Sequence, residues 1–231
     1  MSGREQILGA IRRSLGRGPL DPSQQADLDS RLDSRPRGIV PARVDRPQPE
    51  LVDLFETMAR EAAAVVRRVP DFASVPDAVQ GFLAEHNLPA ELVASPALAE
   101  LPWAGRPTLS VRFDAARDAD LVSVTPAFAG IAETGTLMLP SGAGTPSTLN
   151  FLPDTHIVVL PSARIVGPYE DAWDRLRARD RVGEGGLLPR TVNLVTGPSR
   201  SGDIEQIIQL GAHGPRRLLI LVVEQGDWPG S

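Results

Sequence analysis

The sequence predicts an α/β domain over residues 50–231, a three-layer sandwich with a mixed, largely parallel sheet. The first observation behind this prediction is a series of short, nearly continuous apolar runs, each followed by Gly, Pro or polar residues, at residues 121–124, 136–139, 156–160, 192–195 and 218–223. Such runs are typical of strands buried on both faces. The second is that helical patterns precede and separate these runs, and helices on both faces of a sheet give three layers. In sheets of this kind, ligands bind at the carboxyl ends of the strands.

Four stretches carry the spacing or the boundary residues of helices. They are residues 51–66, 74–87, 168–176 and 203–210. In the first, apolar residues from Leu51 to Val66 recur at three and four positions, and in the third Pro168 suits the first turn of a helix. Short strands are expected at residues 92–94 and 108–111. The early helices therefore supply an outer layer, and the early strands join the sheet.

Residues 1–49 are predicted to be an N-terminal amphipathic helix and a flexible linker. Ser2 and Glu5 form a capping-box pattern, and apolar residues follow at helical spacing from Ile7 to Leu15. From residue 17 the chain is rich in Pro, Arg, Asp and Ser, with too few large apolar residues to offset the entropy of ordering. The helix needs a surface to cover its apolar stripe, either on its own domain or on another molecule.

The composition removes several kinds of chemistry. The 231 residues include no cysteine, so the chain holds no disulfide, no thiolate nucleophile and no iron–sulfur cluster bound through cysteine. Lysine is also absent, which leaves the binding of anions to arginine or to backbone N–H groups. The three histidines do not share the spacing of a zinc site, so no metal site is expected.

Charge and hydropathy argue against two classes of partner. A formal net charge of −5 and an aromatic content of 4% disfavour nucleic acid, which needs a basic face and stacking platforms. No apolar run approaches the roughly 18–20 residues that span a bilayer, and the N-terminus leads into an amphipathic helix instead of a signal-peptide core. The sequence therefore predicts a cytoplasmic protein without a membrane partner.

The densest polar cluster follows the predicted strand at residues 192–195. Gly197, Ser199 and Arg200 form a turn, and a predicted helix behind it would aim free N–H groups and its positive dipole end outward, with Arg200 as a fixed cation. This pattern indicates an anion site, with Asp203 and Glu205 as further candidates in the same motif. The alternative is an ordinary strand-to-helix turn, capped by Ser199 or Ser201, in which Arg200 pairs with Asp203 or Glu205.

A second candidate cluster centres on Glu133, which is followed by Thr134, Gly135 and Thr136. Its carboxylate begins at the edge of the predicted sheet, where it can serve as a general base, a nucleophile or an acceptor of a hydroxyl proton. The alternative is a tight turn that needs Gly135 and in which Glu133 caps Thr134 or Thr136.

Of the three histidines, His213 is the strongest candidate for proton transfer. It lies in a glycine-bounded turn before the last strand, which favours exposure, and Arg216 follows as a second cation. His86 is expected to close a helix, whereas His156 begins a strand and faces either the core or the pocket. A triad of Ser199, His213 and Asp203 is a further hypothesis, although Gly197-Pro198-Ser199 is not a nucleophile-elbow sequence.

Four segments together resemble the LUD-domain family. They are residues 131–137, 151–159, 197–205 and 211–215, and the resemblance covers roughly residues 120–223. Four motifs in one order are more specific than any single motif. The sequence departs from the family pattern at Ser201-Gly202, where the family usually has Thr-Ala, and this affects the start of the helix predicted there.

The resemblance implies both a fold and a role. The fold is similar to that of the sugar-phosphate isomerase and CoA-transferase superfamily, some members of which use a nucleophilic glutamate in a turn like that of Glu133. The role is in the oxidation of L-lactate to pyruvate with two partner proteins, which carry the iron–sulfur clusters. In that role, Arg200 or Arg216 would bind a small carboxylate, or the pocket would take a cofactor, and Glu133 or His213 would accept a proton.

Two other functions stay open on the sequence alone. One is a stand-alone enzyme that acts on a phosphorylated or CoA-linked substrate and uses Glu133 as nucleophile or base. The other is a non-catalytic subunit whose polar motifs hold the fold and a partner interface. A site requires Glu133, Ser199, Arg200 and His213 to converge on an open pocket, while a scaffold would bury the motifs in mutual hydrogen bonds.

Overall fold

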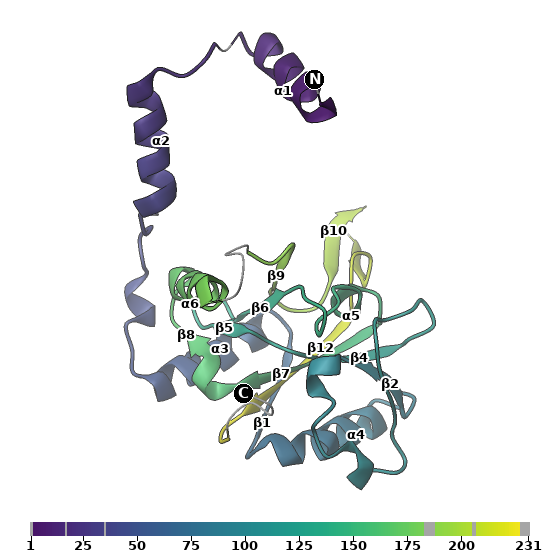
Figure 1. The fold of residues 1–231 in the computed structure, drawn as a ribbon. Helices are drawn as coiled ribbons and strands as arrows, with labels where there is room; N and C mark the ends of the chain where they lie inside the picture. The colour runs from purple at the N-terminus through teal and green to yellow at the C-terminus, as the bar shows by residue number, and fades with distance from the viewer. Residues whose placement is uncertain (1, 17, 35, 183–187, 205–206, 227–231) are drawn as a thin grey trace. The chain divides into compact units, whose positions relative to one another are not determined.

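The computed structural model describes residues 2–16, 18–34, 36–182, 188–204 and 207–226. The chain divides into two units, residues 1–39 and 40–231. The first unit contains two helices, and the second contains all the strands of the described residues (Figure 1). None of the helices in the described ranges is both long enough and apolar enough to cross a bilayer.

The first unit consists of α1 (Gly3–Ser14) and α2 (Pro22–Ser34). The capping box of α1 is confirmed, because the Ser2 hydroxyl accepts the Glu5 N–H at 3.3 Å and the Glu5 carboxylate accepts the Ser2 N–H at 2.8 Å. Helix α2 lies within the segment that the sequence predicts to be a linker. Asp21 accepts the N–H of Ser23 at 2.9 Å, which satisfies a free donor of the first turn and favours a local helix.

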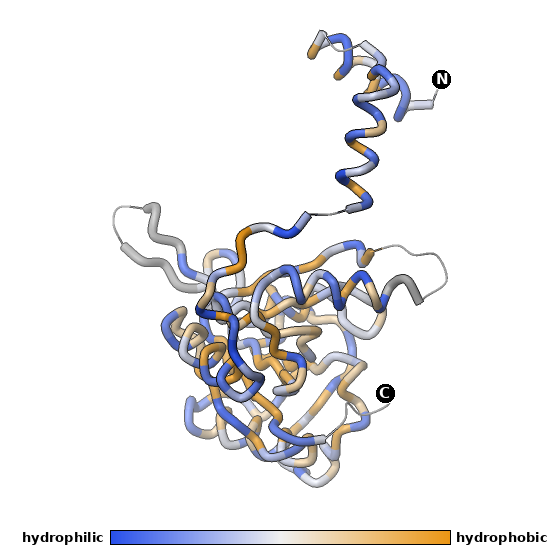
Figure 2. The backbone as a smooth tube through the Cα atoms, turned by 90° about the vertical axis from the view of Figure 1, so that its left-hand side faces the viewer, coloured by the Kyte–Doolittle hydropathy of each residue, from blue (hydrophilic) through white to orange (hydrophobic). Residues whose placement is uncertain are grey.

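The main sheet of the second unit has six parallel strands in the order β1-β12-β7-β4-β2-β3. These strands are β1 (Val65–Val69), β2 (Glu91–Ala94), β3 (Ser110–Phe113), β4 (Val122–Pro126), β7 (Thr155–Pro161) and β12 (Arg217–Val223). Strand β12 explains the continuous apolar run at its position, since Leu219 and Leu221 pack on one face and Ile220 and Val222 on the other. Figure 2 shows these central segments as hydrophobic.

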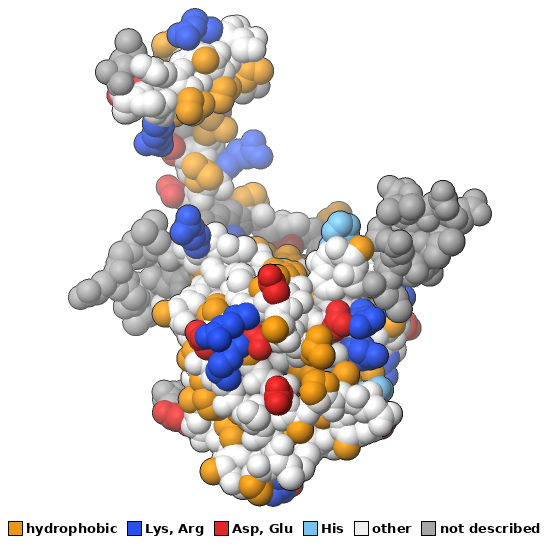
Figure 3. All heavy atoms as spheres, turned by 90° about the vertical axis from the view of Figure 1, so that its right-hand side faces the viewer, with side chains coloured by type: hydrophobic (Ala, Val, Ile, Leu, Met, Phe, Trp, Pro, Cys, Tyr) orange, Lys and Arg blue, Asp and Glu red, His pale blue; other side chains and the backbone are white. Residues whose placement is uncertain are grey.

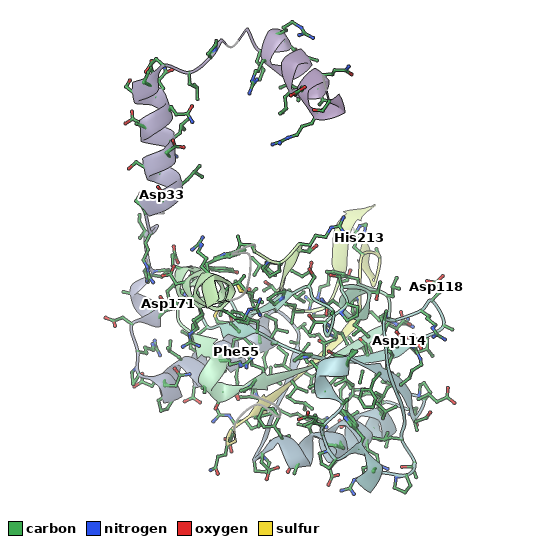
Figure 4. All side chains as sticks on the ribbon, viewed as in Figure 1. Asp33, Phe55, Asp114, Asp118, Asp171 and His213 are labelled. Carbon is green, nitrogen blue, oxygen red and sulfur yellow. The ribbon has the colours of Figure 1, made fainter. Side chains whose placement is uncertain are left out.

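Helices cover both faces of the main sheet. Helix α4 (Val75–Glu85) packs on one face, and α3 (Gln48–Glu61) packs on the other, where Phe55 is fully buried between the helix and the strands (Figure 4). Short 3-10 turns connect these layers at Ala42–Val44, Phe72–Ser74, Pro96–Leu98, Trp103–Gly105 and Ser162–Arg164. The predicted α/β architecture with a largely parallel sheet is confirmed.

A second, four-stranded sheet lies on the α3 side of the main sheet, in the order β8-β5-β6-β9. Its strands are β5 (Ala129–Ile131), β6 (Thr136–Pro140), β8 (Ile165–Val166) and β9 (Val192–Val195). Strand β6 pairs antiparallel with β5 and β9. Leu137 faces the main core, while Met138 packs against α6 (Tyr169–Val182), which covers the outer side. Two predicted strands, β6 and β9, therefore belong to this sheet and not to the parallel one.

The predicted helix at residues 51–66 is too long. Helix α3 ends at Glu61, and strand β1 begins at Val65. Ala63 adopts the left-handed conformation with φ 65°, and the Ala64 N–H donates to the carbonyl of Ala59 at 2.9 Å, which closes the helix. Val66 fits the helical spacing by coincidence, because it is a buried position of the next strand.

The predicted helix at residues 203–210 is wrong. The structure has a hairpin there, formed by β10 (Arg200–Ile204) and β11 (Ile207–Leu210), with Arg200 paired to Leu210. Gly202 disfavours a helix, and the β-branched isoleucines favour strands. The turn at Gly197 is consequently not followed by a helix, so the predicted site at a helix N-terminus does not form.

Candidate functional site

A pocket of about 250 Å³ opens at the amino end of the main sheet. It is lined by α5 (Thr148–Phe151), the loop after β9, the turn before β12, and His156 and Leu218, which are the second residues of β7 and β12. The sequence-based expectation placed the ligand at the carboxyl ends of the strands, so the pocket lies at the opposite edge. Its volume is below the roughly 300–1,000 Å³ of sites for drug-sized ligands and suits a small molecule.

A row of buried polar side chains lies beneath the pocket. Strand register places Ser123 opposite His156, so these side chains share one face of the sheet with Thr125. Thr125 Oγ1 lies 2.7 Å from His156 Nε2, and the Ser123 hydroxyl donates to the carbonyl of Leu149 at 2.6 Å. Further along the same face the side chains are apolar, beneath α3 and the second sheet. Of this polar row, His156 is the member that lines the pocket and forms part of its floor.

His156 is an uncharged group in this floor. Burial lowers the pKa of His156 from 6.5 to about 3, because the charged imidazolium would lose its hydration. The ring is therefore neutral at physiological pH and contributes a hydrogen-bonding group instead of a cation. The sequence analysis left open whether His156 faces the core or the pocket, and the structure places it at the boundary of both.

Gly197 and Gly135, from two different predicted motifs, contact the end of the same helix. Both have positive φ, 74° and 67° respectively. A Cβ atom on Gly197 would lie 2.1 Å from the carbonyl oxygen of Ala62, and one on Gly135 would lie 2.3 Å from the backbone nitrogen of Ala59. Only glycine fits at these positions. Helix α3 thus holds both motifs close to one another.

Arg200 is the cationic side chain that lines the pocket among the residues the structure describes. It is exposed, and its guanidinium makes a 3.5 Å contact with the carbonyl of Ala62. Among the residues that the structure describes, its other N–H donors have no partner, so they can bind an anion. Arg216, the second predicted cation, instead pairs with Asp154 at the start of β7, and it is not among the lining residues.

Ser199 and His213 meet at the rim of the pocket. The Ser199 hydroxyl accepts the backbone N–H of His213 at 3.1 Å, and the Ser199 N–H donates to the carbonyl of Pro215 at 2.8 Å. The contact with His213 is through its backbone and not its imidazole, so the structure gives no geometry of a catalytic triad. His213 is exposed, as predicted (Figure 4). The side chain of Asp203 and all of Glu205 lie outside the described residues.

Glu133 lies in the turn between β5 and β6 and is not among the residues that line the pocket. Its N–H donates to the carbonyl of Gly167 at 3.1 Å, and its carbonyl accepts from Arg43 at 2.9 Å. The half-buried side chain has no hydrogen-bond or ion-pair partner among the described residues. The structure therefore brings Gly197, Ser199, Arg200 and His213 together at one pocket and leaves Glu133 outside it.

Thr134 and Thr136 bond to other hydroxyl groups. Thr134 Oγ1 lies 2.6 Å from Thr136 Oγ1, and both lie within 2.9 Å of the hydroxyl of Tyr169. Thr136 Oγ1 also lies 2.6 Å from Thr196 Oγ1, and Thr196 lines the pocket. These two predicted ligand-binding residues therefore reach the pocket only through Thr196.

Several lining residues were not among the predicted site residues, including Asn150, Phe151 and Thr196. One signal was present, since Ser123 and Thr125 alternate with valines in a strand that otherwise reads as apolar. That alternation predicts a polar row on one face of the strand. Which neighbouring strand supplies the matching His156 follows only from the pairing register.

Two observations concern other kinds of ligand. Within the described part of the chain, no group of three or more His, Asp or Glu side chains is placed to hold a metal ion. On the face that Figure 3 presents, arginines lie beside acidic side chains, and the ion pairs of the second unit include Arg112 with Asp114 and with Asp120. The charge of Arg112 is thus balanced by its carboxylate neighbours.

Comparison with known proteins identifies the family. The LUD domain model matches residues 110–223, a range that contains every residue lining the pocket. Lactate utilization protein C of Geobacillus kaustophilus (strain HTA426) is 31% identical over 186 residues, which cover 74% of this chain and 72% of that protein. The chain belongs to the LUD-domain family. The resemblance that four motifs indicated is therefore confirmed.

Two further similar proteins match over different extents. Lactate utilization protein C of Geobacillus sp. (strain WCH70) is 38% identical over 93 residues, so the match spans 40% of this chain and only 38% of that relative. The crystal structure of a DUF162 family protein from Deinococcus radiodurans is similar, with a TM-score of 0.56 and 27% identity over 77% of this chain and 99% of that chain. The arrangement is consistent with the expected likeness to the sugar-phosphate isomerase and CoA-transferase superfamily.

Proposed function

We propose that this protein is a component of an L-lactate utilization system and that its pocket binds a small carboxylate. The observation that carries the proposal is Arg200 at a small pocket that lies entirely within the LUD domain. Relatives named lactate utilization protein C connect that domain with lactate. With no lysine in the chain, arginine is the side chain that supplies a permanent cation.

The chemistry of the pocket rim supports a carboxylate ligand. A guanidinium presents paired N–H donors that match the two oxygens of a carboxylate. The Ser199 hydroxyl already accepts the His213 N–H, so its own proton is available for donation to the ligand. His213, exposed at the rim, is proposed to accept or donate a proton during turnover in the complex.

The oxidation of L-lactate to pyruvate releases two electrons and two protons, and the proposal assigns the electrons to iron–sulfur partner proteins. This chain has no cysteine with which to ligate such a cluster. Its proposed contribution is to bind the small acid and to dock the partners. Glu133 has no part in this proposal, because it does not line the pocket.

Growth on L-lactate as the sole carbon source tests the proposal. A strain with the gene deleted is expected to fail to grow on L-lactate and to grow normally on glucose. Wild-type protein and the Arg106→Gln control, whose arginine pairs with Asp77 outside the pocket, should restore growth, while Arg200→Gln should not. Normal growth of the deletion strain on L-lactate would refute the proposal.

Co-purification tests the partner half of the proposal separately. The tagged full-length chain is expected to retain proteins whose visible absorption and iron content show iron–sulfur clusters. A lactate oxidation assay on those proteins, with and without this chain, then measures its contribution. Equal rates in the two assays would remove this chain from the oxidising complex.

A further inference from the structure

Four hydroxyl groups form one hydrogen-bond network behind the pocket. Thr134, Thr136 and Tyr169 make a triangle, with oxygen–oxygen distances of 2.6, 2.7 and 2.9 Å. Thr196 joins the network through one hydrogen bond to Thr136, with an oxygen–oxygen distance of 2.6 Å. Thr136 is fully buried, whereas Thr196 is exposed and lines the pocket. The network thus has one end at the site.

A count of protons fixes the direction of the bond between Thr196 and Thr136. Each hydroxyl has one proton to donate and two lone pairs that accept. The three bonds of the triangle use the three protons of Thr134, Thr136 and Tyr169. The fourth bond must therefore use the proton of Thr196, which donates to Thr136. Any contact that the Thr196 hydroxyl makes with a ligand can then only be as an acceptor.

We propose that the pocket selects a small hydroxy acid over the corresponding keto acid, because Thr196 accepts a hydrogen bond from the ligand's hydroxyl while Arg200 binds the carboxylate. This inference rests on the proposed carboxylate site, and it specifies the group on the carbon next to the ligand's carboxylate. A ligand hydroxyl can donate to the Thr196 oxygen. A keto oxygen and the Thr196 oxygen are both acceptors, so they have no proton to share and repel each other. A methylene group at the same place makes no hydrogen bond.

The matched ligand series is L-lactate, pyruvate and propionate, which differ only in the group next to the carboxylate. Calorimetric titration of the full-length protein measures the three affinities. L-Lactate is expected to bind about tenfold more tightly than either of the other acids. Pyruvate and propionate lack the hydrogen bond to Thr196 and leave its oxygen unsatisfied.

Variants at the pocket test the role of Thr196. Thr196→Val removes the acceptor, so the affinities for L-lactate and pyruvate should become equal within about twofold. Thr196→Ser keeps the hydroxyl and should retain the preference for L-lactate. Thermal unfolding of each variant checks that the fold is intact, and the ratio of the two affinities is the readout.

Tyr169→Phe provides a test from outside the pocket, since Tyr169 is not a lining residue. Without its hydroxyl, the remaining three hydroxyls make two bonds, and Thr136 can donate to Thr196. Thr196 then regains a proton for a keto oxygen, so the affinity for pyruvate should rise and the preference should fall. A purely structural role of Tyr169 would weaken the binding of both acids equally and leave their ratio unchanged.

The possible outcomes separate this inference from the proposed function. A wild-type protein that binds all three acids equally, and loses them in Arg200→Gln, would overturn the hydroxy-acid preference and leave the carboxylate site in place. An unchanged ratio in Tyr169→Phe would overturn the role of the hydroxyl network. A protein that binds none of the three acids would overturn the carboxylate site and this inference together.

Discussion

The substitution of Gly197, a buried turn residue packed against the end of α3, by alanine should destabilise the protein. An L-residue in the left-handed conformation costs about 1–2 kcal/mol, and the φ of Gly197 is 74°. The added Cβ would also lie 2.1 Å from the carbonyl oxygen of Ala62, so the turn or the end of α3 must move. Overpacking of this kind costs about 1–3 kcal/mol. The sum is a loss of about 2–5 kcal/mol in the free energy of unfolding.

Urea unfolding measures this loss as a fall in the transition midpoint on the order of 1 M. The matched control is Gly81→Ala, on the exposed side of α4, where a Cβ meets no atom within 4 Å. There the change should stabilise the protein by about 0.5–1 kcal/mol, because alanine favours a helix. The packing of Gly197 against α3 would be refuted if Gly197→Ala unfolded at the wild-type urea concentration.

Three further predictions concern single residues. Because the folded pKa of His156, about 3, lies below its unfolded value of 6.5, the unfolded state binds more protons below pH 6.5. Its contribution to the free energy of unfolding should therefore fall by about 1.4 kcal/mol per pH unit as pH drops below 6.5. If the free energy of unfolding of His156→Asn fell as steeply as that of the wild type between about pH 7 and 5, this account would be contradicted. Ala63→Gly should stabilise the protein by about 1 kcal/mol by relieving the left-handed backbone that closes α3; a lower urea midpoint would count against that account. Arg216→Gln should cost under about 1 kcal/mol, since Arg216 and Asp154 are both partly exposed, and should leave calorimetric binding of L-lactate intact; a loss as large as that of Arg200→Gln would place Arg216 in the site after all.

Much of the fold follows from local pattern. The apolar run at 218–223 is long enough that both of its faces must be buried, and the structure places it as β12 within the parallel sheet. The Ser2 capping box and the helix expected after Pro168 depend on contacts between near neighbours in the chain. Such features can be predicted because their energetics are largely complete within a few residues.

The errors arise where one pattern is compatible with two structures. Residues from Leu51 to Val66 share a helical spacing, yet the left-handed Ala63 divides them into a helix and a strand. The segment that contains Gly202 and Ile204 is polar enough to look like a helix surface, but it pairs with residues 207–210 as a hairpin. In both cases the competing structure depends on a partner segment that local spacing does not identify.

The sequence by itself determined the α/β class and the available chemistry of the site. Because the chain has no cysteine or lysine, the sequence leaves arginine, imidazole, hydroxyl and carboxylate groups as the reactive side chains of a site. The LUD motifs pointed to Gly197, Ser199, Arg200 and His213 as members of the site. Only the tertiary structure decided which of these groups meet. The pairing of β4 with β7 brings Thr125 to His156, and the end of α3 brings the Gly135 and Gly197 turns together, leaving Glu133 outside the pocket. Contacts between residues far apart in the chain depend on strand order and register, which are properties of the packed sheet as a whole.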